Sequence, residues 1–463
     1  RDVAPSRGLG DVYKRQLEDL HSASAVIFNW DAKLVASAIL IISYLILFTE
    51  KLNRAVVALV GACIMIFAGV LTQETAIAGI DFNTLALLTG MMIIVGIAEK
   101  SGMFQYVAVW AVHRTRANPR SLLFTLGLIT AVFSALLDNV TTVLLIVPVT
   151  FQITEKLKVN PYPYLIMEIF ASNIGGTATL IGDPPNILIG SALNLSFMDF
   201  VNELTPVVAV TMLVLILAFD FVYGRKLKTS LRNQAEVMKI KAIDAITDWT
   251  LLKKSLFVLF AVIAGFIAAE HIHVANGTIA MFGAAVMMLL YTFGNAHSER
   301  DRKIESAFNL VDWTTIFFFA GLFAIVYGLE EAGVLELLGH KFTEFTEGSI
   351  EKTTMLIVWV SALVSTAIDN IPFVATMIPL VKTIEADMGG REAMMPVWWA
   401  LSLGACYGGN GSLIAASANV IVAGMSQRHG EPIHFMRFLI WSLPVMLVSV
   451  GIAALYLHIR HFM

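Results

Sequence analysis

Two short stretches of the chain each place an acid–amide pair inside an otherwise apolar run. Residues 134–148 read SALLDNVTTVLLIVP, and residues 365–379 read STAIDNIPFVATMIP. An ionised Asp at the centre of a membrane helix costs on the order of 2.5 to 3.5 kcal/mol, so such residues usually face a water-filled cavity or a bound ion. Asp138-Asn139 and Asp369-Asn370 therefore predict a binding site for an ion.

The composition indicates an integral membrane protein. Of the 463 residues, 57% are hydrophobic and 14% charged, and the mean hydropathy is +0.76, whereas soluble domains carry about a quarter charged residues. A net charge of −4 gives no basic surface for nucleic acid. We expect an all-α polytopic protein of the bacterial inner membrane, surrounded by membrane lipid and without a nucleic-acid partner.

Ten apolar segments are predicted to be membrane spans, because runs of about 20 residues can cross a hydrocarbon core of about 30 Å as helices. The first set runs from about Lys33 to Phe48, Ala55 to Leu71, Thr84 to Ala98, Tyr162 to Leu193 with a break, and Leu204 to Tyr223. The second set runs from about Leu251 to Ala269, Gly277 to Phe293, Thr314 to Leu329, Pro396 to Gly424 with a break, and Phe438 to Leu457.

An Asp-Asn stretch with apolar flanks follows the third member of each set, at Leu122 to Leu157 and at Met355 to Ile384. Each stretch is either two ordinary spans or one re-entrant helical hairpin with Asp-Asn at its tip. Cytoplasmic loops are enriched in Lys and Arg. If each stretch enters the membrane and returns to the side from which it came, all basic loops lie on the cytoplasmic side and all acidic loops on the other. This predicts ten spans, two hairpins and both termini outside.

The two sets are a repeat. An offset of 231 residues relates Gly90 to Gly321, Asp138 to Asp369 and Pro148 to Pro379. Since five spans per copy is an odd number, the second copy must be inverted, as in secondary transporters. The predicted divisions are an N-terminal tail over 1–32, a first repeat over 33–223, a cytoplasmic linker over 224–250, a second repeat over 251–457 and a C-terminal tail over 458–463. The sequence of residues 1–16 is unlike the rest of the chain, and we assign it no role. Whether these residues are native or left by cloning or assembly stays open.

A second repeated element predicts a break in one span of each set. The first copy runs from Gly175-Gly176 through Asp183-Pro184-Pro185 to Asn186, and the second from Gly408-Gly409 to Asn419. Gly costs about 1 kcal/mol and Pro about 3 kcal/mol in a helix interior, so both spans should unwind. Unwound backbone at membrane depth is tolerated where it lines a cavity or is buried in protein. Its carbonyls can hold a cation, and half-helix amides can face an anion.

The candidate ligands are hard oxygens and amides, which suit Na⁺ or a proton, and the sequence shows no thiolate or imidazole cluster of a transition-metal site. We expect no cofactor beyond a coupling ion. The tip candidates for cation and proton are Asp138, Asn139, Thr141, Thr142, Asp369 and Asn370. The candidates from the unwound spans are Asn173, Gly175, Gly176, Thr177, Thr179, Asp183, Asn186, Gly408, Gly409, Asn410, Ser412 and Asn419. Two structural alternatives stay open: each tip Asp caps a helix, and Asp183 shapes the turn before Pro184.

With these motifs in hand, the chain resembles the ion transporter superfamily, most closely its P protein branch, which is grouped with arsenite permeases and divalent-anion/sodium symporters. The resemblance covers about Leu34 to Leu457 and implies a homodimer, a scaffold and a mobile region, and elevator-like alternating access. Sodium-coupled dicarboxylate carriers have Ser-Asn-Thr at the tips, where this chain has Asp-Asn. NhaD-type sodium/proton antiporters are similar in having Asp-Asn followed by Thr-Thr at the first tip, but lack the Pro-Pro-Asn seen here.

These observations favour a secondary active transporter that exchanges Na⁺ or another monovalent cation for H⁺. Two alternatives stay open: a Na⁺- or H⁺-coupled carrier of small anions such as a dicarboxylate, an arsenite-like oxyanion or chloride, and a passive anion channel. No His-Glu-x-x-His or Gly-x-Ser-x-Gly pattern lies in the spans, so we do not expect an enzyme.

Overall fold

The computed structural model describes residue 26 and residues 30–49, 51–385 and 387–463. Within these residues the regular secondary structure is helical, with no strand, as expected for an all-α protein. Residues 1–16, whose origin was left open, lie outside the described part of the chain.

The first predicted repeat contains α2 (Ala32–Phe48), α3 (Arg54–Phe67), α4 (Gln73–Ala78), α5 (Phe82–Glu99), α6 (Met103–Arg114), α7 (Pro119–Leu136), α8 (Asn139–Leu157), α9 (Tyr162–Gly176), α10 (Pro184–Leu193) and α11 (Phe197–Val222). The predicted linker contains η2 (Gly224–Lys226), α12 (Leu231–Val237) and η3 (Ala242–Ala245). The second repeat contains α13 (Trp249–Ile272), α14 (Asn276–Thr292), α15 (His297–Phe308), α16 (Trp313–Glu331), α17 (Val334–Phe345), α18 (Ile350–Ala367), α19 (Asn370–Glu385), α20 (Arg391–Gly408), α21 (Ser417–Arg428) and α22 (Phe435–Phe462).

Among the described helices, eight are long and apolar enough to cross a membrane, namely α5, α7, α8, α11, α13, α16, α18 and α22. The apolar helices α2, α3 and α14 are shorter. Both predicted breaks are present, because α9 stops at Gly176 before α10 starts, and α20 stops at Gly408 before α21 starts. The chain is thus a polytopic membrane protein with two interrupted spans.

The described helices form two compact units. One contains the described residues up to Asp81 together with Thr314–Leu338, and the other contains the described residues of Phe82–Trp313 and Gly339–Met463. Each unit draws residues from both halves of the sequence. The units are therefore a different division from the predicted repeats, whose boundaries stay a prediction.

A matched pair of glycines brings helices from the two halves together. A Cβ added to Gly321 of α16 would lie 2.6 Å from the carbonyl carbon of Ala58 on α3, within the first unit. A Cβ added to Gly90 of α5 would lie 2.6 Å from the carbonyl carbon of Ala280 on α14, within the second unit. Small residues allow such close backbone approach between membrane helices. The same contact therefore recurs at two positions related by the repeat.

Several helices lie in segments that were predicted as loops or linker, namely α4, α6, α12, α15 and α17. Two of them, α6 and α17, form a matched pair. Helices α6 and α17 follow Gly102 and Gly333, which are also 231 positions apart and have φ angles of 83° and 68°. Charged residues within both helices, such as Arg114 and Glu336, hid them from a search for apolar spans. A left-handed glycine before each helix turns the chain in both halves.

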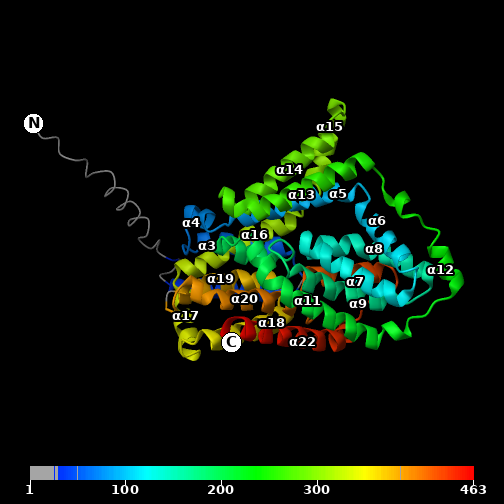
Figure 1. The fold of residues 1–463 in the computed structure, drawn as a ribbon. Helices are drawn as coiled ribbons and strands as arrows, with labels where there is room; N and C mark the ends of the chain where they lie inside the picture. Colours follow the sequence, from blue (N-terminus) through cyan, green and yellow to red (C-terminus); the bar gives the residue numbers. More distant parts are fainter. Residues whose placement is uncertain (1–25, 27–29, 50, 386) are drawn as a thin grey trace, which may run out of the picture. The chain divides into compact units, whose positions relative to one another are not determined.

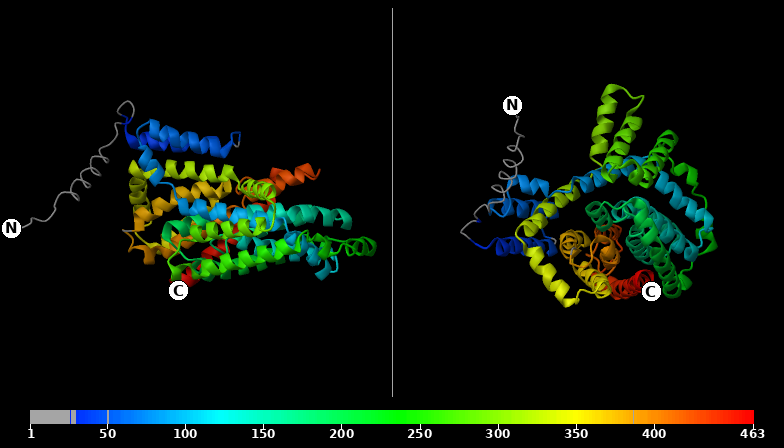
Figure 2. Two further views of the ribbon diagram at one scale, coloured as in Figure 1. Left: turned by 90° about the horizontal axis from the view of Figure 1, so that it is seen from above. Right: turned by 60° about the vertical axis from the view of Figure 1, so that its left-hand side comes forward.

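Within the second unit, α8 is seen on the right and α19 on the left of Figure 1. In Figure 2, the orange α20 and the red α22 lie side by side, in agreement with their direct packing. Helix α11 contacts both of them. The two tips and both breaks belong to this unit.

Candidate functional site

The two Asp-Asn pairs each begin a helix, α8 at the first tip and α19 at the second. Asp138 Oδ1 accepts a hydrogen bond from the backbone N–H of Thr141 at 2.7 Å, and its Oδ2 accepts one from the Thr141 hydroxyl at 2.6 Å. Asp369 Oδ1 accepts from the backbone N–H of Ile371 at 3.1 Å. Both carboxylates are half-buried. The capping interaction considered as an alternative is present at both tips, and it leaves acceptor capacity on each carboxylate.

Helix α7 runs beside α9 in the same direction. Near the start of both helices, the Tyr164 hydroxyl donates to the carbonyl of Pro119 at 2.8 Å. Near their ends, the Ser134 hydroxyl donates to the carbonyl of Ser172 at 2.6 Å. The first tip, at Asp138, therefore lies at the level where α9 breaks.

Glycines of the broken spans bring the backbones into contact at this level. A Cβ on Gly175 would lie 2.3 Å from the carbonyl oxygen of Ala131 on α7, and a Cβ on Gly408 would lie 2.6 Å from that of Ala362 on α18. These two glycines, predicted as site residues, serve the packing of each break against its neighbouring helix. Gly176 similarly faces the backbone of Gly182.

Two buried Asn side chains hold the unwound segments. Asn186 and Asn419 occupy matching positions, and the Nδ2 of each donates to two carbonyls of its own segment. The distances are 3.0 Å to Thr177, 2.9 Å to Thr179, 2.7 Å to Gly409 and 2.9 Å to Ser412. Because a helix break leaves carbonyls without intrahelical partners, these amides satisfy groups that would otherwise be buried unpaired.

Side chains from both tips meet at one carboxylate oxygen. Asn139 Nδ2 lies 3.3 Å from Asp183 Oδ1, and Asn370 Nδ2 lies 3.4 Å from the same oxygen. Asp183 is fully buried at the start of α10 and makes no side-chain cap hydrogen bond there. Its carboxylate therefore joins the two tips, whereas the carboxylate of Asp138 caps its own helix.

A neighbouring amide links the two breaks. Asn173 Nδ2 lies 3.0 Å from Asn410 Oδ1 and 3.0 Å from Asn419 Oδ1, and its own Oδ1 lies 3.4 Å from Asn139 Nδ2. Asn173 thus connects the first tip to the second broken span. We call the six side chains joined in this way the central cluster: Asn139, Asn173, Asp183, Asn370, Asn410 and Asn419.

The central cluster keeps unused hydrogen-bonding capacity. Asp183 Oδ2 and Asn410 Nδ2 are buried without a hydrogen-bond partner, and so is the hydroxyl of Thr142 on α8. The Cys406 thiol is a close neighbour of the Asp183 carboxylate. In the part of the chain that the structure describes, no cationic side chain pairs with Asp183, and its charged neighbours are Asp138 and Asp369. No group of three or more His, Cys, Asp or Glu that could hold a metal occurs among the described residues. The site is therefore rich in acceptors and short of positive charge.

Four helices begin at this level, namely α8, α10, α19 and α21. A helix N-terminus carries a partial positive charge of about half an elementary charge. These termini offset part of the cost of burying acidic groups here. They also leave a place where the half-helix amides can face an anion.

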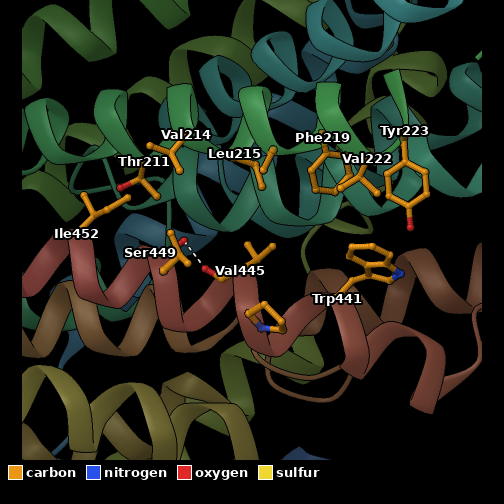
Figure 3. Close-up of a pocket in the computed structure, with 13 residues that line it drawn as sticks. Thr211, Val214, Leu215, Phe219, Val222, Tyr223, Trp441, Val445, Ser449 and Ile452 are labelled. Carbon is orange, nitrogen blue, oxygen red and sulfur yellow. Dashed lines mark hydrogen bonds between the residues drawn. The ribbon is translucent and has the colours of Figure 1, made fainter. Parts of the chain in front are cut away.

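Three cavities of the second unit lie near the site or beside it. One of about 450 Å³ touches Asn83 at the start of α5, together with Asn194 and Asp199, and one of about 740 Å³ touches Glu99 at the end of α5, together with Gln152. The third, of about 180 Å³, is apolar and lies between α11 and α22, with Tyr223 and Trp441 at one end (Figure 3). The first two have mixed polar and apolar linings and touch opposite ends of α5.

The sequence analysis missed one acidic residue of the first broken span. Glu168 of α9 is buried, and its Oε1 accepts a hydrogen bond from the hydroxyl of Thr150 on α8 at 2.5 Å. Its Oε2 has no partner. The sequence could have indicated this residue, since Glu168 is the one charged residue between Tyr162 and Gly176.

Interrupted spans that meet at a buried polar cluster define this chain as a membrane transport protein. The model of the citrate transporter family (CitMHS) matches residues 44–404, and the chain belongs to this family. This confirms the predicted placement in the ion transporter superfamily. The family is one of transporters and not of enzymes.

Several relatives share most of the chain. An uncharacterized transporter of Mycobacterium tuberculosis is 42% identical over 432 residues, which cover 92% of this chain and 98% of that protein. The P protein of Mus musculus is 33% identical over 510 residues, covering 92% of this chain and 60% of that protein. The crystal structure of the Alcanivorax borkumensis YdaH transporter, whose topology is described as unusual, matches with a TM-score of 0.58 at 13% identity, covering 93% of this chain and 98% of that one. That structure shares the fold.

Proposed function

We propose that this chain is a secondary active transporter that exchanges Na⁺, or another monovalent cation, for H⁺ at the central cluster and the two tips. The observation that carries the proposal is Asp183, whose Oδ1 receives amides from both tips while its Oδ2 is buried without a partner. A buried carboxylate without a cationic side chain is stabilised by either a proton or a bound cation. Competition between the two for one carboxylate gives obligatory exchange.

The tip carboxylates support the same chemistry. Asp138 and Asp369 are half-buried, each caps its helix, and each retains acceptor capacity towards the site. In this proposal Asp138 and Asp369, together with Asp183, bind the cation and the proton in alternation. Amide oxygens of the central cluster and carbonyls of the unwound segments supply hard oxygen ligands.

The helix directions support two re-entrant hairpins. Helix α7 is parallel to α9 and ends where α9 breaks. The first tip, which follows α7, therefore lies part-way along the broken span that α9 and α10 form. Helix α8 then returns to the end where α9 starts, since three residues separate Leu157 from Pro161. Each hairpin would therefore enter from one side and turn at the level of the site.

The two hairpins would enter from opposite sides. The Arg391 guanidinium, at the start of α20, donates to the carbonyl of Leu193 at the end of α10 at 3.2 Å. Phe151 of α8 stacks on His429, which follows α21, with ring centroids 4.1 Å apart. The second broken span therefore runs opposite to the first, which is the arrangement that an inverted repeat requires. Elevator-like movement and a homodimer remain part of the proposal on the strength of the resemblance.

A coupled carrier of small anions is the second candidate. It is favoured by the four helix N-termini at the site and by the family name, which refers to citrate. In that case Asp138, Asp183 and Asp369 would bind the coupling cation, and the N-termini would face the anion. A passive anion channel would share the N-termini but would conduct without coupling.

The test is an ion screen on the purified protein in proteoliposomes. Pulses of Na⁺, Li⁺ and K⁺ are applied to vesicles that enclose a pH-sensitive dye, and uptake of labelled citrate is measured in parallel with and without a Na⁺ gradient. The proposal expects Na⁺-induced proton flux without citrate uptake. Gradient-dependent citrate uptake would favour the second candidate, and uncoupled anion current would favour the channel. The exchange proposal fails if Asp138→Asn and Asp369→Asn both leave the proton flux unchanged.

A further inference from the structure

A buried polar pair joins α8 to α9 outside the central cluster. Glu168 and Thr150 are both fully buried, and the Thr150 hydroxyl donates to Glu168 Oε1 at 2.5 Å. Glu168 Oε2 has no partner. An acidic residue at membrane depth is costly and is usually functional. The proposed exchange described above does not use this group.

The second half of the chain shows that the fold does not need this pair. At the offset of 231 that relates the tips, Thr150 corresponds to Val381 on α19. At the offset of 233 that relates the breaks, Glu168 corresponds to Leu401 on α20. Val381 and Leu401 are both fully buried. The corresponding positions of the second half are thus buried and apolar, so burial at these positions does not by itself require a polar pair.

The pair lies between the central cluster and the end at which α9 begins. Glu168 precedes Asn173 by five residues, a rise of about 7.5 Å along the helix. On α8, Thr150 follows Thr142 by eight residues, a rise of about 12 Å, and the Thr142 hydroxyl is buried without a partner. The position that matches Thr142 in the second half is Phe373. At these two matched positions, Thr142 and Thr150, the polar group is therefore present in the first half and replaced by an apolar side chain in the second.

A cavity lies against α8 at residues close in sequence to Thr150. The cavity of about 740 Å³ is lined by Val149 and Gln152, which flank Thr150 along the chain. Its other lining residues include Lys100, Gln105 and Lys239. Gln105 Oε1 in this lining is buried without a protein partner, as at sites that hold water. The cavity therefore reaches helix α8 at residues adjacent in sequence to Thr150.

We propose that Glu168 is a second proton-binding site, which passes protons between the 740 Å³ cavity and the central cluster. This inference rests on the proposed proton exchange. A proton held on Oε2 of Glu168 leaves towards the cluster when a cation is released there, and a proton from water in the cavity replaces it. The carboxyl group returns to its starting form, so the charge balances in each cycle.

The surroundings of Glu168 suit such a role. Tyr164, one turn earlier on α9, is the titratable group nearest along the helix, and its hydroxyl is engaged by Pro119. The helices packed against α9 are α7, α8, α11, α20 and α21. In the described residues, none of them places a cationic or anionic side chain in an ion pair with Glu168, and α8 offers it the neutral Thr150. No fixed positive charge therefore neutralises this carboxylate, and its one hydrogen-bond partner, Thr150, is a neutral donor that leaves Oε2 open to a proton.

The test combines infrared spectroscopy with transport of reconstituted protein. Glu168→Gln keeps the shape and the hydrogen bond from Thr150, and the double variant T150V/E168L reproduces the apolar pair of the second half. We expect E168Q to remove one carbonyl band of a protonated carboxylic acid. We expect both variants to slow Na⁺-driven proton flux by about tenfold or more, as for the loss of a positioned proton-transfer group. Na⁺ affinity, measured by binding, should change less than about twofold, because the central cluster is intact.

Two results would overturn the inference: an unchanged carboxylic-acid band in E168Q, or a flux and pH profile of T150V/E168L equal to those of the wild type. If the double variant does not fold, E168Q alone tests the inference, through the infrared band and the Na⁺-driven proton flux. If the wild type shows no Na⁺-driven proton flux, the proposed function fails. The infrared band then decides separately whether Glu168 holds a proton.

Discussion

Asn139 and Asn370 stand 231 positions apart in the chain, and both donate to one oxygen, Oδ1 of Asp183, at 3.3 and 3.4 Å. Each is the first residue of the helix that begins at its tip. The two halves of the protein are thus joined through a single buried carboxylate. A proton or a cation at Asp183 acts on both contacts at once, which is a physical means of coupling the two tips.

Removal of either amide should weaken cation binding, and removal of both should not be additive. A hydrogen bond to a charged group contributes about 1.5 to 3 kcal/mol, so N139A and N370A should each reduce Na⁺ affinity roughly tenfold or more. Because both amides share Asp183, the double variant should deviate from the sum of the single variants by about 0.5 to 3 kcal/mol. Na⁺ titration of the four proteins by calorimetry measures this deviation. Strict additivity would show that the two tips act independently.

The glycines at the breaks should not tolerate a methyl group. In G175A and G408A the new Cβ would meet backbone atoms of α7 or α18 at 2.3 and 2.6 Å, and backbone cannot rotate away as a side chain can. We expect a loss of about 3 kcal/mol or more of stability, at or above the upper end for overpacking. Thermal unfolding in detergent checks this. Gly451 of α22 has nothing within 4 Å of its added Cβ, so G451A is the matched control and should unfold at or above the wild-type temperature.

The helix breaks and the tips that carry the site could be predicted from the residue types in each segment. Paired glycines and Asp-Pro-Pro inside apolar runs cannot continue a helix, so the breaks after Gly176 and Gly408 were predictable. The tips at Asp138 and Asp369 were marked by acidic residues in apolar surroundings. The constant offset between the two copies then predicted that each half supplies the same parts.

What the sequence did not reveal depends on contacts between the halves. Asp183 precedes two prolines, and its role as a turn residue was as plausible as a role in binding. Only the three-dimensional arrangement shows that its carboxylate meets Asn139 and Asn370 and leaves the helix uncapped. Glu168 was overlooked because the comparison of repeats looked for matched residues, and its counterpart, Leu401, is apolar.

The two amides that hold the unwound segments should both be needed for stability, and Asn186, which lies outside the central cluster, should not be needed for ion selectivity. N186A and N419A each leave two carbonyls without a donor, which costs about 1 to 3 kcal/mol per unsatisfied buried group. Both variants should therefore unfold at lower temperature. N186A should still prefer Na⁺ over K⁺ as the wild type does, whereas N419A also removes an amide oxygen of the central cluster. Asn309 is exposed, and N309A serves as the control for loss of an amide elsewhere. Wild-type thermal stability of N186A would contradict the assigned role.

The inverted arrangement predicts opposite exposure of two loops. Lys156 and Asp387 are exposed at the ends of the first and second helix pairs. In a background with the exposed Cys63 replaced by Ala, a membrane-impermeant maleimide should label K156C from the cytoplasmic side, because basic loops stay inside. It should label D387C from the opposite side. Labelling of both variants in the same vesicle orientation would rule out inverted repeats.

The exchange of a cation for a proton at Asp183 is tested most directly by proton flux in proteoliposomes that contain either the wild type or D183N. Asn keeps the shape of Asp183 but cannot bind a proton and release it at neutral pH. We expect Na⁺ pulses to drive proton movement in the wild type and none above empty liposomes in D183N. D183N should be at least as thermally stable, because a buried carboxylate without a cationic partner is removed. Sodium-driven proton flux in D183N equal to that of the wild type would contradict the proposal.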